Sequence, residues 1–453
     1  MNKIALNASN FLIILLPVSL ITGPMLSDLS VVLLDIFFIY FLWTEKKFNF
    51  LDNKIFKYLL LFCLFISIRS LFAEDILLSG KSAILYFRFT IFAFAISFFL
   101  VKLPNLKRSF LISCSISFFL LALDSYIQFI YGKNLLGYKI NNIDKLNSLF
   151  GDEAIMGSYV SKLLPIYFAL LLMNFDIKKN STLIIVSLGM LLSLVFLSGS
   201  RASLFLTIMF FFLVFIYLKQ VRKLIIILFA SITVLLIIGS IFSEKVRYKV
   251  SINFKDPFER ILKLNSFDKK YNNEFIEEEI LTNKKSQINQ SDFFDNKYNL
   301  SGQNKIIYFS EIHHSHYLTA LEMFYDNKLF GQGTKMFRVR CSNIRFKTNK
   351  YSCATHPHNF YIQLLAENGI IGFLFLFIVF VQISIFLIKR LYKPTKNIYI
   401  NNETMILLLG IYCYIWPIVP SGSLFNNYLS ITIYLPLGFY LYFKEKREIH
   451  NNE

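Results

Sequence analysis

The stretch CATHPHNFYIQLLAENGIIGF, residues 353–373, marks the point at which a polar loop turns back into a membrane. Two histidines, His356 and His358, precede an apolar run that begins near Gly369. Pro357 suits the first turn of a helix, and Asn368-Gly369 is typical of a helix end. We therefore expect a helix over about 357–368, followed directly by a membrane span.

This predicted helix has one polar side. Asn359, Gln363 and Glu367 recur at i, i+4 and i+8 and so form a stripe, while Phe360 and its apolar neighbours lie elsewhere on the helix. His358 borders the stripe. Periodicity alone leaves two interpretations open. The segment is an interfacial amphipathic helix with incidental histidines, or a neutral imidazole acts as a general base at the membrane surface.

The composition indicates a membrane protein. Of the 453 residues, 55% are hydrophobic, and mean hydropathy is +0.53. Uncharged apolar runs of the length of a membrane span recur along the chain, so one soluble core is excluded. The net charge of +18 comes mostly from short basic clusters between these runs. Because these clusters form no continuous basic face, we exclude nucleic acid as a partner.

A window of about 19 residues predicts an all-α polytopic membrane protein with about twelve transmembrane helices. The predicted spans are 10–23, 28–43, 55–73, 82–101, 108–131, 155–174, 182–199, 202–219, 223–243, 369–389, 402–420 and 424–443.

Basic clusters fall in every second connection and predict the orientation, because Lys and Arg in short loops stay in the cytoplasm. The clusters are Lys46/Lys47/Lys54/Lys57, Lys102/Lys107/Arg108, Lys178/Lys179, Lys219/Arg222/Lys223, Lys389/Arg390/Lys393/Lys396 and Lys444/Lys446/Arg447. Both termini are then cytoplasmic. Three parts follow: a bundle of about nine spans (1–243), an outward loop (244–368), and about three further spans with a tail (369–453).

The long loop has two parts. Residues 265–305 are polar with few packing side chains, which predicts a mobile or loosely helical segment. The later stretch YLTALEMFYDNKLFGQG predicts an amphipathic helix that ends before Gly331 and Gly333. Its expected apolar side consists of Leu318, Leu321, Phe324 and Tyr325.

Cys341 and Cys353 are the two cysteines of the long loop, whereas Cys63, Cys114 and Cys413 lie in predicted spans. Since the orientation places the loop in an oxidising compartment, we expect a Cys341–Cys353 disulfide. The alternative is a zinc site that also uses His356 and His358. It lacks CxxC or HExxH spacing, so we predict no metal and no cofactor.

Several cations are predicted near the outward face. Arg201, in LSGSRASL, lies between two apolar runs, where a lone charge is costly unless it pairs or faces water. Arg69, Arg88 and Lys162 lie toward the outer halves of their spans. Together they would form a rim suited to a lipid-linked diphosphate, because guanidinium binds phosphate oxygens in pairs. The alternative for each is an ordinary side chain that extends to the head groups.

Further histidines and arginines stand in the long loop. His313, His314 and His316 precede the predicted loop helix and are candidate site residues, surface groups or a weak metal cluster. Arg338, Arg340 and Arg345 flank Cys341. We expect these arginines to be solvated, with phosphate or head-group contact as the alternative.

Five motifs carry a resemblance that covers most of the chain from about residue 120 onward. In order, they are LNSLFGDEAIMGSYVSKLLP, LSGSRASL, LFGQGTKMFRVRC, CATHPHNFYIQLLAENGIIGF and SGSLFNNYLSITIYLPLGF. Together they resemble the O-antigen ligase and O-antigen polymerase superfamily of bacterial inner-membrane proteins. The resemblance implies a GT-C-like architecture and metal-independent glycosyl transfer on the periplasmic face, with a donor glycan carried on undecaprenyl diphosphate.

The resemblance also assigns roles. It implies that His358, rather than His356, is catalytic, and that Arg201 binds the diphosphate. Asn359 and Glu367 join them as candidate substrate contacts. A second family arginine is expected just before YLTALEMF, where this sequence has the three loop histidines instead. The second diphosphate contact therefore stays open among those histidines, Arg247 and Arg260.

The resemblance implies two possible acceptors. A sugar of the lipid A core would make the protein a ligase, the reading we favour, and a second lipid-linked glycan would make it a polymerase. A lipid or glycan transporter is the alternative from another class. It would favour inverted repeats around a midplane site, and we find no convincing repeat.

Overall fold

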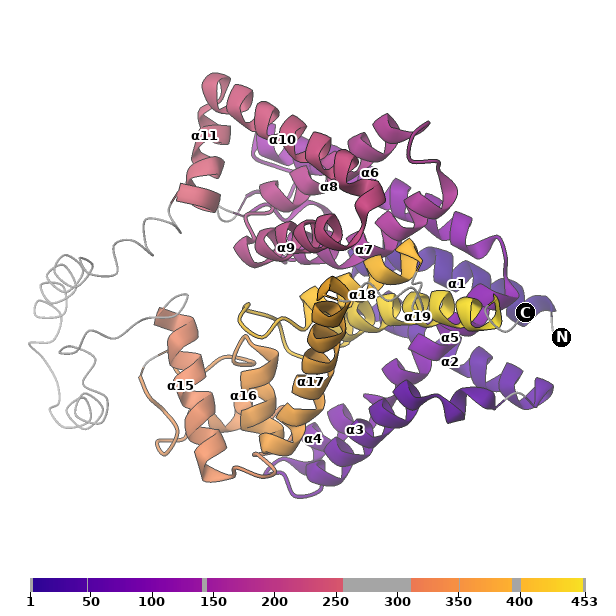
Figure 1. The fold of residues 1–453 in the computed structure, drawn as a ribbon. Helices are drawn as coiled ribbons and strands as arrows, with labels where there is room; N and C mark the ends of the chain where they lie inside the picture. Colours follow the sequence, from indigo (N-terminus) through magenta and orange to yellow (C-terminus); the bar gives the residue numbers. More distant parts are fainter. Residues whose placement is uncertain are drawn as a thin grey trace, which may run out of the picture.

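The computed structural model describes residues 3–46, 48–140, 145–255, 311–349, 351–392 and 401–450. Within these ranges the regular elements are helices, and the one β-bridge, between Lys133 and Lys139, is isolated (Figure 1). The predicted mobile segment 265–305 lies outside the described residues.

Each of the twelve predicted spans contains a helix. These helices are α1 (Lys3–Thr22), α2 (Pro24–Glu45), α3 (Lys54–Ser70), α5 (Phe87–Lys102), α6 (Leu106–Tyr131), α7 (Met156–Asn174), α8 (Ser181–Leu197), α9 (Arg201–Tyr217), α10 (Arg222–Phe242), α17 (Phe360–Tyr392), α18 (Asn402–Tyr414) and α19 (Asn427–His450). The short helix α4 (Ile76–Ile84) precedes α5.

Seven segments of the described chain are long and apolar enough to cross a membrane. They contain α1, α2, α4 with α5, α6, α7, α10 and α17. Four other predicted spans, α3, α8, α9 and α18, form helices of 13 to 17 residues. The structure thus supports a polytopic helical membrane protein with seven full-length candidate spans, where the sequence predicted twelve.

The bundle is held together by close helix contacts. α19 packs along α5, α18 packs along α7, and α1 contacts both α2 and α6. Gly438 on α19 lies so near α5 that a Cβ there would come within 2.7 Å of the Ala93 carbonyl oxygen, and Gly410 on α18 is similarly close to Pro165. Small residues at such contacts let helix backbones approach, which is how helices pack inside membranes.

The elements of the long loop lie away from the chain ends. Figure 1 shows the start of α1 and the end of α19 at one end of the bundle. The helices α11 (Glu244–Val250), α15 (Glu311–Asp326) and α16 (Phe337–Arg340) lie toward the other end. This separation agrees with the predicted topology, and the compartment that each end faces stays a prediction from the loop charges.

A break at Gly369 divides α17. Its φ of 65° and ψ of −165° fall in a region that only glycine occupies readily. The predicted helix end at Asn368-Gly369 is therefore confirmed, although the helix begins at Phe360, later than the predicted 357. A Cβ on Gly369 would lie 2.3 Å from the Leu329 carbonyl oxygen, so two backbones touch here.

We expect Gly369→Ala to destabilise this junction by roughly 2–5 kcal/mol, because the new side chain meets both an unfavourable backbone conformation and a clash. Thermal unfolding of the detergent-purified protein, followed by size-exclusion chromatography, measures the effect. Gly189→Ala is the matched control, since Gly189 lies within α8 and a Cβ there would be at an ordinary contact distance of 3.7 Å from Leu228 Cδ1. Equal melting temperatures for the two variants would contradict this account.

Candidate functional site

Four histidine rings gather at the end of the molecule that carries the loop helices. The ring centre of His358 lies 4.2 Å from that of His356, 5.1 Å from His313 and 5.4 Å from His316. His313 and His316 come from α15, whereas His356 and His358 precede α17. His314 lies on α15 as well and is half-buried. The structure thus brings together residues that are about forty positions apart in the chain.

The backbone around His358 is fixed from both sides. His358 has a φ of 58°, in the left-handed region that few residues other than glycine adopt. Its carbonyl oxygen accepts a hydrogen bond from the Ser421 N–H at 2.8 Å. The next residue, Asn359, caps α17, because its Oδ1 accepts from the N–H of Tyr361 at 2.9 Å. These contacts direct the imidazole toward the other histidines.

The segment 415–424, between α18 and α19, wraps the start of α17. The Tyr361 hydroxyl donates to the Ile415 carbonyl at 2.5 Å, and Asn359 Nδ2 donates to the Pro417 carbonyl at 2.7 Å. Gln363 bonds Ser423 Oγ through Nε2 at 3.0 Å. Sequence analysis singled out the motif SGSLFNNYLSITIYLPLGF, which begins in this turn, but did not connect the turn with His358. Its run of small residues, PSGS, was the available signal.

The predicted polar stripe exists, but it is buried. The side chain of Glu367 is 0% exposed, and its carboxylate accepts from the Phe337 N–H at 3.2 Å and from Gln363 Nε2 at 3.0 Å. Asn359 is also buried and serves as the helix cap. The two candidate substrate contacts are thus occupied by protein partners, so their observed role is to position the neighbouring backbone.

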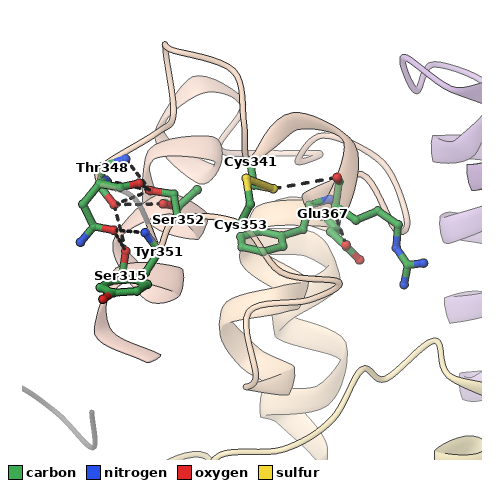
Figure 2. Close-up of a disulfide and its surroundings, with 11 residues drawn as sticks. Ser315, Cys341, Thr348, Tyr351, Ser352, Cys353 and Glu367 are labelled. Carbon is green, nitrogen blue, oxygen red and sulfur yellow. Dashed lines mark hydrogen bonds between the residues drawn. A yellow bond between two sulfur atoms is a disulfide. The ribbon is translucent and has the colours of Figure 1, made fainter. Parts of the chain in front are cut away.

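The predicted loop helix is confirmed as α15, and its expected apolar side is not the side that the structure buries most. Tyr325 is 60% exposed, and Leu318, Leu321 and Phe324 are half-buried. The buried positions are Ser315, His316, Thr319, Ala320 and Met323. Small and polar side chains face inward because α15 packs closely on α17 and bonds to the segment 348–352, as the contacts of Ser315 show (Figure 2).

The predicted disulfide is confirmed. Cys341 and Cys353 are bonded, with Cα atoms 5.1 Å apart (Figure 2). The bond joins the end of α16 to the segment just before His356. On α16, the ring of Phe337 lies 6.4 Å from that of His316. The disulfide and this ring contact attach α16 to the histidine cluster.

The surroundings keep the histidines neutral. Burial lowers the pKa of His358 to about 3, with smaller contributions from His356, His313 and His316. Burial also lowers the pKa of His356 to about 4, and the next largest cause is the positive charge of Arg338. At neutral pH these rings are therefore hydrogen-bond acceptors without charge.

Lys145 is a cation that the sequence analysis did not single out. It is exposed, and its charge acts with burial to lower the pKa of His313. The backbone that follows is held firmly, because Ser148 N–H donates to Gln128 Oε1 at 2.9 Å and Ser148 Oγ donates to Asp124 Oδ2 at 2.7 Å. No local pattern links Lys145 with a histidine so far along the chain.

Arg201 begins α9 and is exposed. Ser200 caps this helix, as its Oγ accepts from the Ser203 N–H at 3.4 Å. The turn before it packs on the start of α7, where a Cβ on Gly157 would lie 2.3 Å from Ser198 Oγ. Glycine at this position therefore lets the Gly-Ser turn approach α7 and present Arg201 to solvent.

A buried lysine holds the other side of the same turn. Lys249 of α11 is 2% exposed, and its Nζ donates to the Leu197 carbonyl at 3.0 Å. Nearby, Asn253 Nδ2 donates to the Phe196 carbonyl at 3.1 Å. Both residues bond carbonyls at the end of α8, where intrahelical partners run out.

Two members of the predicted cationic rim have partners within the protein, and the rim itself stays a prediction. Arg69 donates to the carbonyl oxygens of Phe330 at 3.0 Å and Gly331 at 2.6 Å, so it supports the glycine junction. Arg88 pairs with Asp28 at 2.7 Å, which offsets its charge. Lys162 is half-buried within α7. Two of the three predicted rim cations are thus occupied by structural contacts.

Two arginines, Arg247 and Arg260, were further candidates for the second diphosphate contact. Arg247 donates to the Ser240 carbonyl at 3.1 Å and so binds the preceding helix. Arg260 lies outside the described residues. Within the described ranges, no group of three or more His, Cys, Asp or Glu side chains is arranged to hold a metal ion.

Residues 185–377 match a family model described as O-antigen ligase. The matched region includes Arg201, α15, the disulfide and His358. This part of the chain is similar to the O-antigen ligase family. The resemblance to the O-antigen ligase and polymerase superfamily is thereby confirmed. The search of curated proteins found no match.

In this family-matched region, the disulfide should shield both loop thiols from alkylation. The other cysteines, Cys63, Cys114 and Cys413, are buried, so the untreated native protein should bind almost no maleimide. Mild reduction should add two labels per chain, and Cys341→Ser/Cys353→Ser should abolish this gain. Mass spectrometry counts the labels. Labelling of Cys341 or Cys353 without reductant would contradict the bonded state.

Proposed function

We propose that this protein transfers a glycan from undecaprenyl diphosphate to an acceptor hydroxyl at the periplasmic face of the bacterial inner membrane. The observation that carries the proposal is the gathering of three histidines around His358 inside the family-matched region. A shielded, neutral imidazole is suited to accept a hydrogen bond from a sugar hydroxyl. The family match supports ligase or polymerase chemistry of this class.

The reaction proposed is a single displacement. The acceptor hydroxyl donates a hydrogen bond to His358, and its oxygen attacks the anomeric carbon of the donor. The bond from that carbon to the diphosphate oxygen breaks while the hydroxyl proton moves to His358. Undecaprenyl diphosphate leaves with its charge offset by Arg201. The configuration at the anomeric carbon inverts, and no cofactor or metal takes part.

The low pKa of His358 has a consequence for this step. A free imidazole with a pKa of about 3 is a weak base. An anionic diphosphate nearby favours the protonated ring and so raises the pKa. We infer that donor binding strengthens the base, which would restrict proton transfer to the loaded protein.

The acceptor we favour is a sugar of the lipid A core, which makes the protein a ligase. A polymerase that joins two lipid-linked glycans is the alternative, because the family match covers both kinds of reaction equally. In either case the partners are a lipid-linked donor, a glycan acceptor and membrane lipids. Both termini would lie in the cytoplasm.

Reconstitution separates these possibilities. The purified protein in liposomes is supplied with undecaprenyl-diphosphate glycan, with and without core-lipid acceptor, in the presence and absence of a chelator. Transfer only with core lipid identifies a ligase, and chain growth without it identifies a polymerase. Absence of both products overturns the proposed function, and chelator sensitivity contradicts metal independence.

His358→Ala should lower the transfer rate by about 10²–10⁴, the usual contribution of a general base. Arg201→Ala should lower it by about 10²–10³, since one charge-stabilising contact is lost. Rates come from single-turnover measurements with saturating donor. Each variant must keep the wild-type size-exclusion profile and the Cys341–Cys353 bond. Wild-type transfer by His358→Ala would remove this residue from the mechanism.

As the pH is lowered, kcat/KM should begin to fall only well below the ordinary histidine pKa of 6.5. The pH dependence of kcat/KM reports the pKa values of the free protein. A lowered His358 pKa therefore keeps the required neutral ring present as pH falls. We therefore expect a flat profile from pH 7.5 to about 5.5 for the wild type. A decline centred near pH 6.5 would show that the ring is solvated and unshifted.

A further inference from the structure

Arg338 occupies a distinctive place beside the histidine cluster. It follows Phe337, whose backbone N–H donates to Glu367 Oε1 at 3.2 Å and whose ring lies 6.4 Å from that of His316. Three residues later, Cys341 is bonded to Cys353. The backbone of Arg338 is therefore fixed from both directions, while its side chain is exposed.

The neighbouring arginines have other partners. Arg340 pairs with Glu74 at 3.0 Å and lies over the ring of Phe346 at 5.0 Å. Arg345 pairs with Asp326. Among the described residues, Arg338 has no ion pair of this kind. Burial lowers the pKa of His356, and the charge of Arg338 lowers it further.

A second cation lies close to Arg338. Lys335 is half-buried and has a φ of 61°, a conformation imposed by the turn that joins Gly333 to α16. That turn is bonded to α17 through the Gly333 N–H, which donates to the Glu367 carbonyl at 2.7 Å. Burial and then Arg338 lower the pKa of Lys335, so the two cations share one electrostatic environment.

Two like charges held beside a neutral cluster favour an anion between or beside them. The buried Glu367 carboxylate offsets part of this charge, but it already accepts bonds from Phe337 and Gln363. An exposed guanidinium can bind two phosphate oxygens at once, and an ammonium adds a point charge. The arrangement therefore suits a phosphate group more than a neutral sugar.

We propose that Arg338 and Lys335 form a phosphate-binding pair that holds a substrate phosphate next to His356 and His358. This inference rests on the proposed function and supplies the second cation that the sequence left unassigned. The phosphate belongs to the donor diphosphate or to a phosphorylated acceptor, since both present the same oxyanion chemistry. Arg338 acts here by binding substrate rather than by proton transfer.

Steady-state kinetics with separately varied donor and acceptor test the proposal. Arg338→Ala should raise one KM by about 10- to 100-fold, the loss expected for a charged hydrogen-bonded contact. Lys335→Asn should raise the same KM less, and asparagine tolerates the positive φ. A change in donor KM assigns the diphosphate, and a change in acceptor KM assigns an acceptor phosphate. Arg338→Lys should recover part of the loss.

Arg345→Ala is the matched control, because its side chain is 66% exposed on the same loop and pairs elsewhere. It should leave both KM values unchanged. Unchanged KM values for Arg338→Ala would overturn the proposal, as would an effect that appears for Lys145→Ala and not for Arg338→Ala. Thiol labelling confirms that each variant retains the disulfide.

A binding measurement keeps this test independent of transfer. Undecaprenyl diphosphate alone should raise the melting temperature of the detergent-purified wild type and raise it less for Arg338→Ala if the donor phosphate is bound. A phosphorylated core lipid should show this difference if the acceptor phosphate is bound. Equal shifts for wild type and variant with both ligands overturn the phosphate pair. Absence of transfer by the wild type, with unequal shifts, overturns only the proposed function.

Discussion

The contact between the chain near Gly331 and the break at Gly369 organises the functional end of this protein. The buried polar part of α17 ends at this break, and the apolar, membrane-spanning part begins there, without a linker between them. Glycine allows both the backbone conformation and the approach of the 329–331 backbone. Arg69 then bonds the carbonyls that this approach leaves at Phe330 and Gly331. A cation predicted to bind substrate is thus needed to satisfy backbone groups.

Two segments connect this junction to the histidines. In the segment that follows Gly331, the turn at Gly333 leads to α16, Phe337 and the disulfide. Toward the preceding part of α17, the buried row from Glu367 to Asn359 carries the backbone of His358. Both routes end at one cluster of rings. The site is therefore built on bonds of the backbone and buried side chains, which is the rigidity that positioning a substrate hydroxyl requires.

Local patterns predicted much of this arrangement, and their failures share one cause. The spans, α15, the helix end at Gly369 and the Cys341–Cys353 bond follow from hydropathy, spacing and cysteine placement. The apolar pattern of α15 does not identify its buried side, because the surface that it packs on accepts small polar side chains. The proximity of Lys145 to His313, and of Arg338 to His356, depends on tertiary packing. Lys145 and His313 are far apart in the chain, and no local pattern links Arg338 with His356.

Charge balance explains why the cations are distributed as they are. Burial keeps four clustered imidazoles neutral, so the cluster itself cannot neutralise a diphosphate. Fixed charges must then supply the attraction, and arginine retains its charge in surroundings that deprotonate histidine. In the proposed function, Arg201 would provide one such charge from the membrane bundle. A second cation, on the loop, would also contact the ligand. Ligand binding would then hold the membrane bundle and the histidine loop against one substrate. This chain has histidines just before YLTALEMF, where the family pattern has an arginine. A cation on α16 can take the place of that arginine.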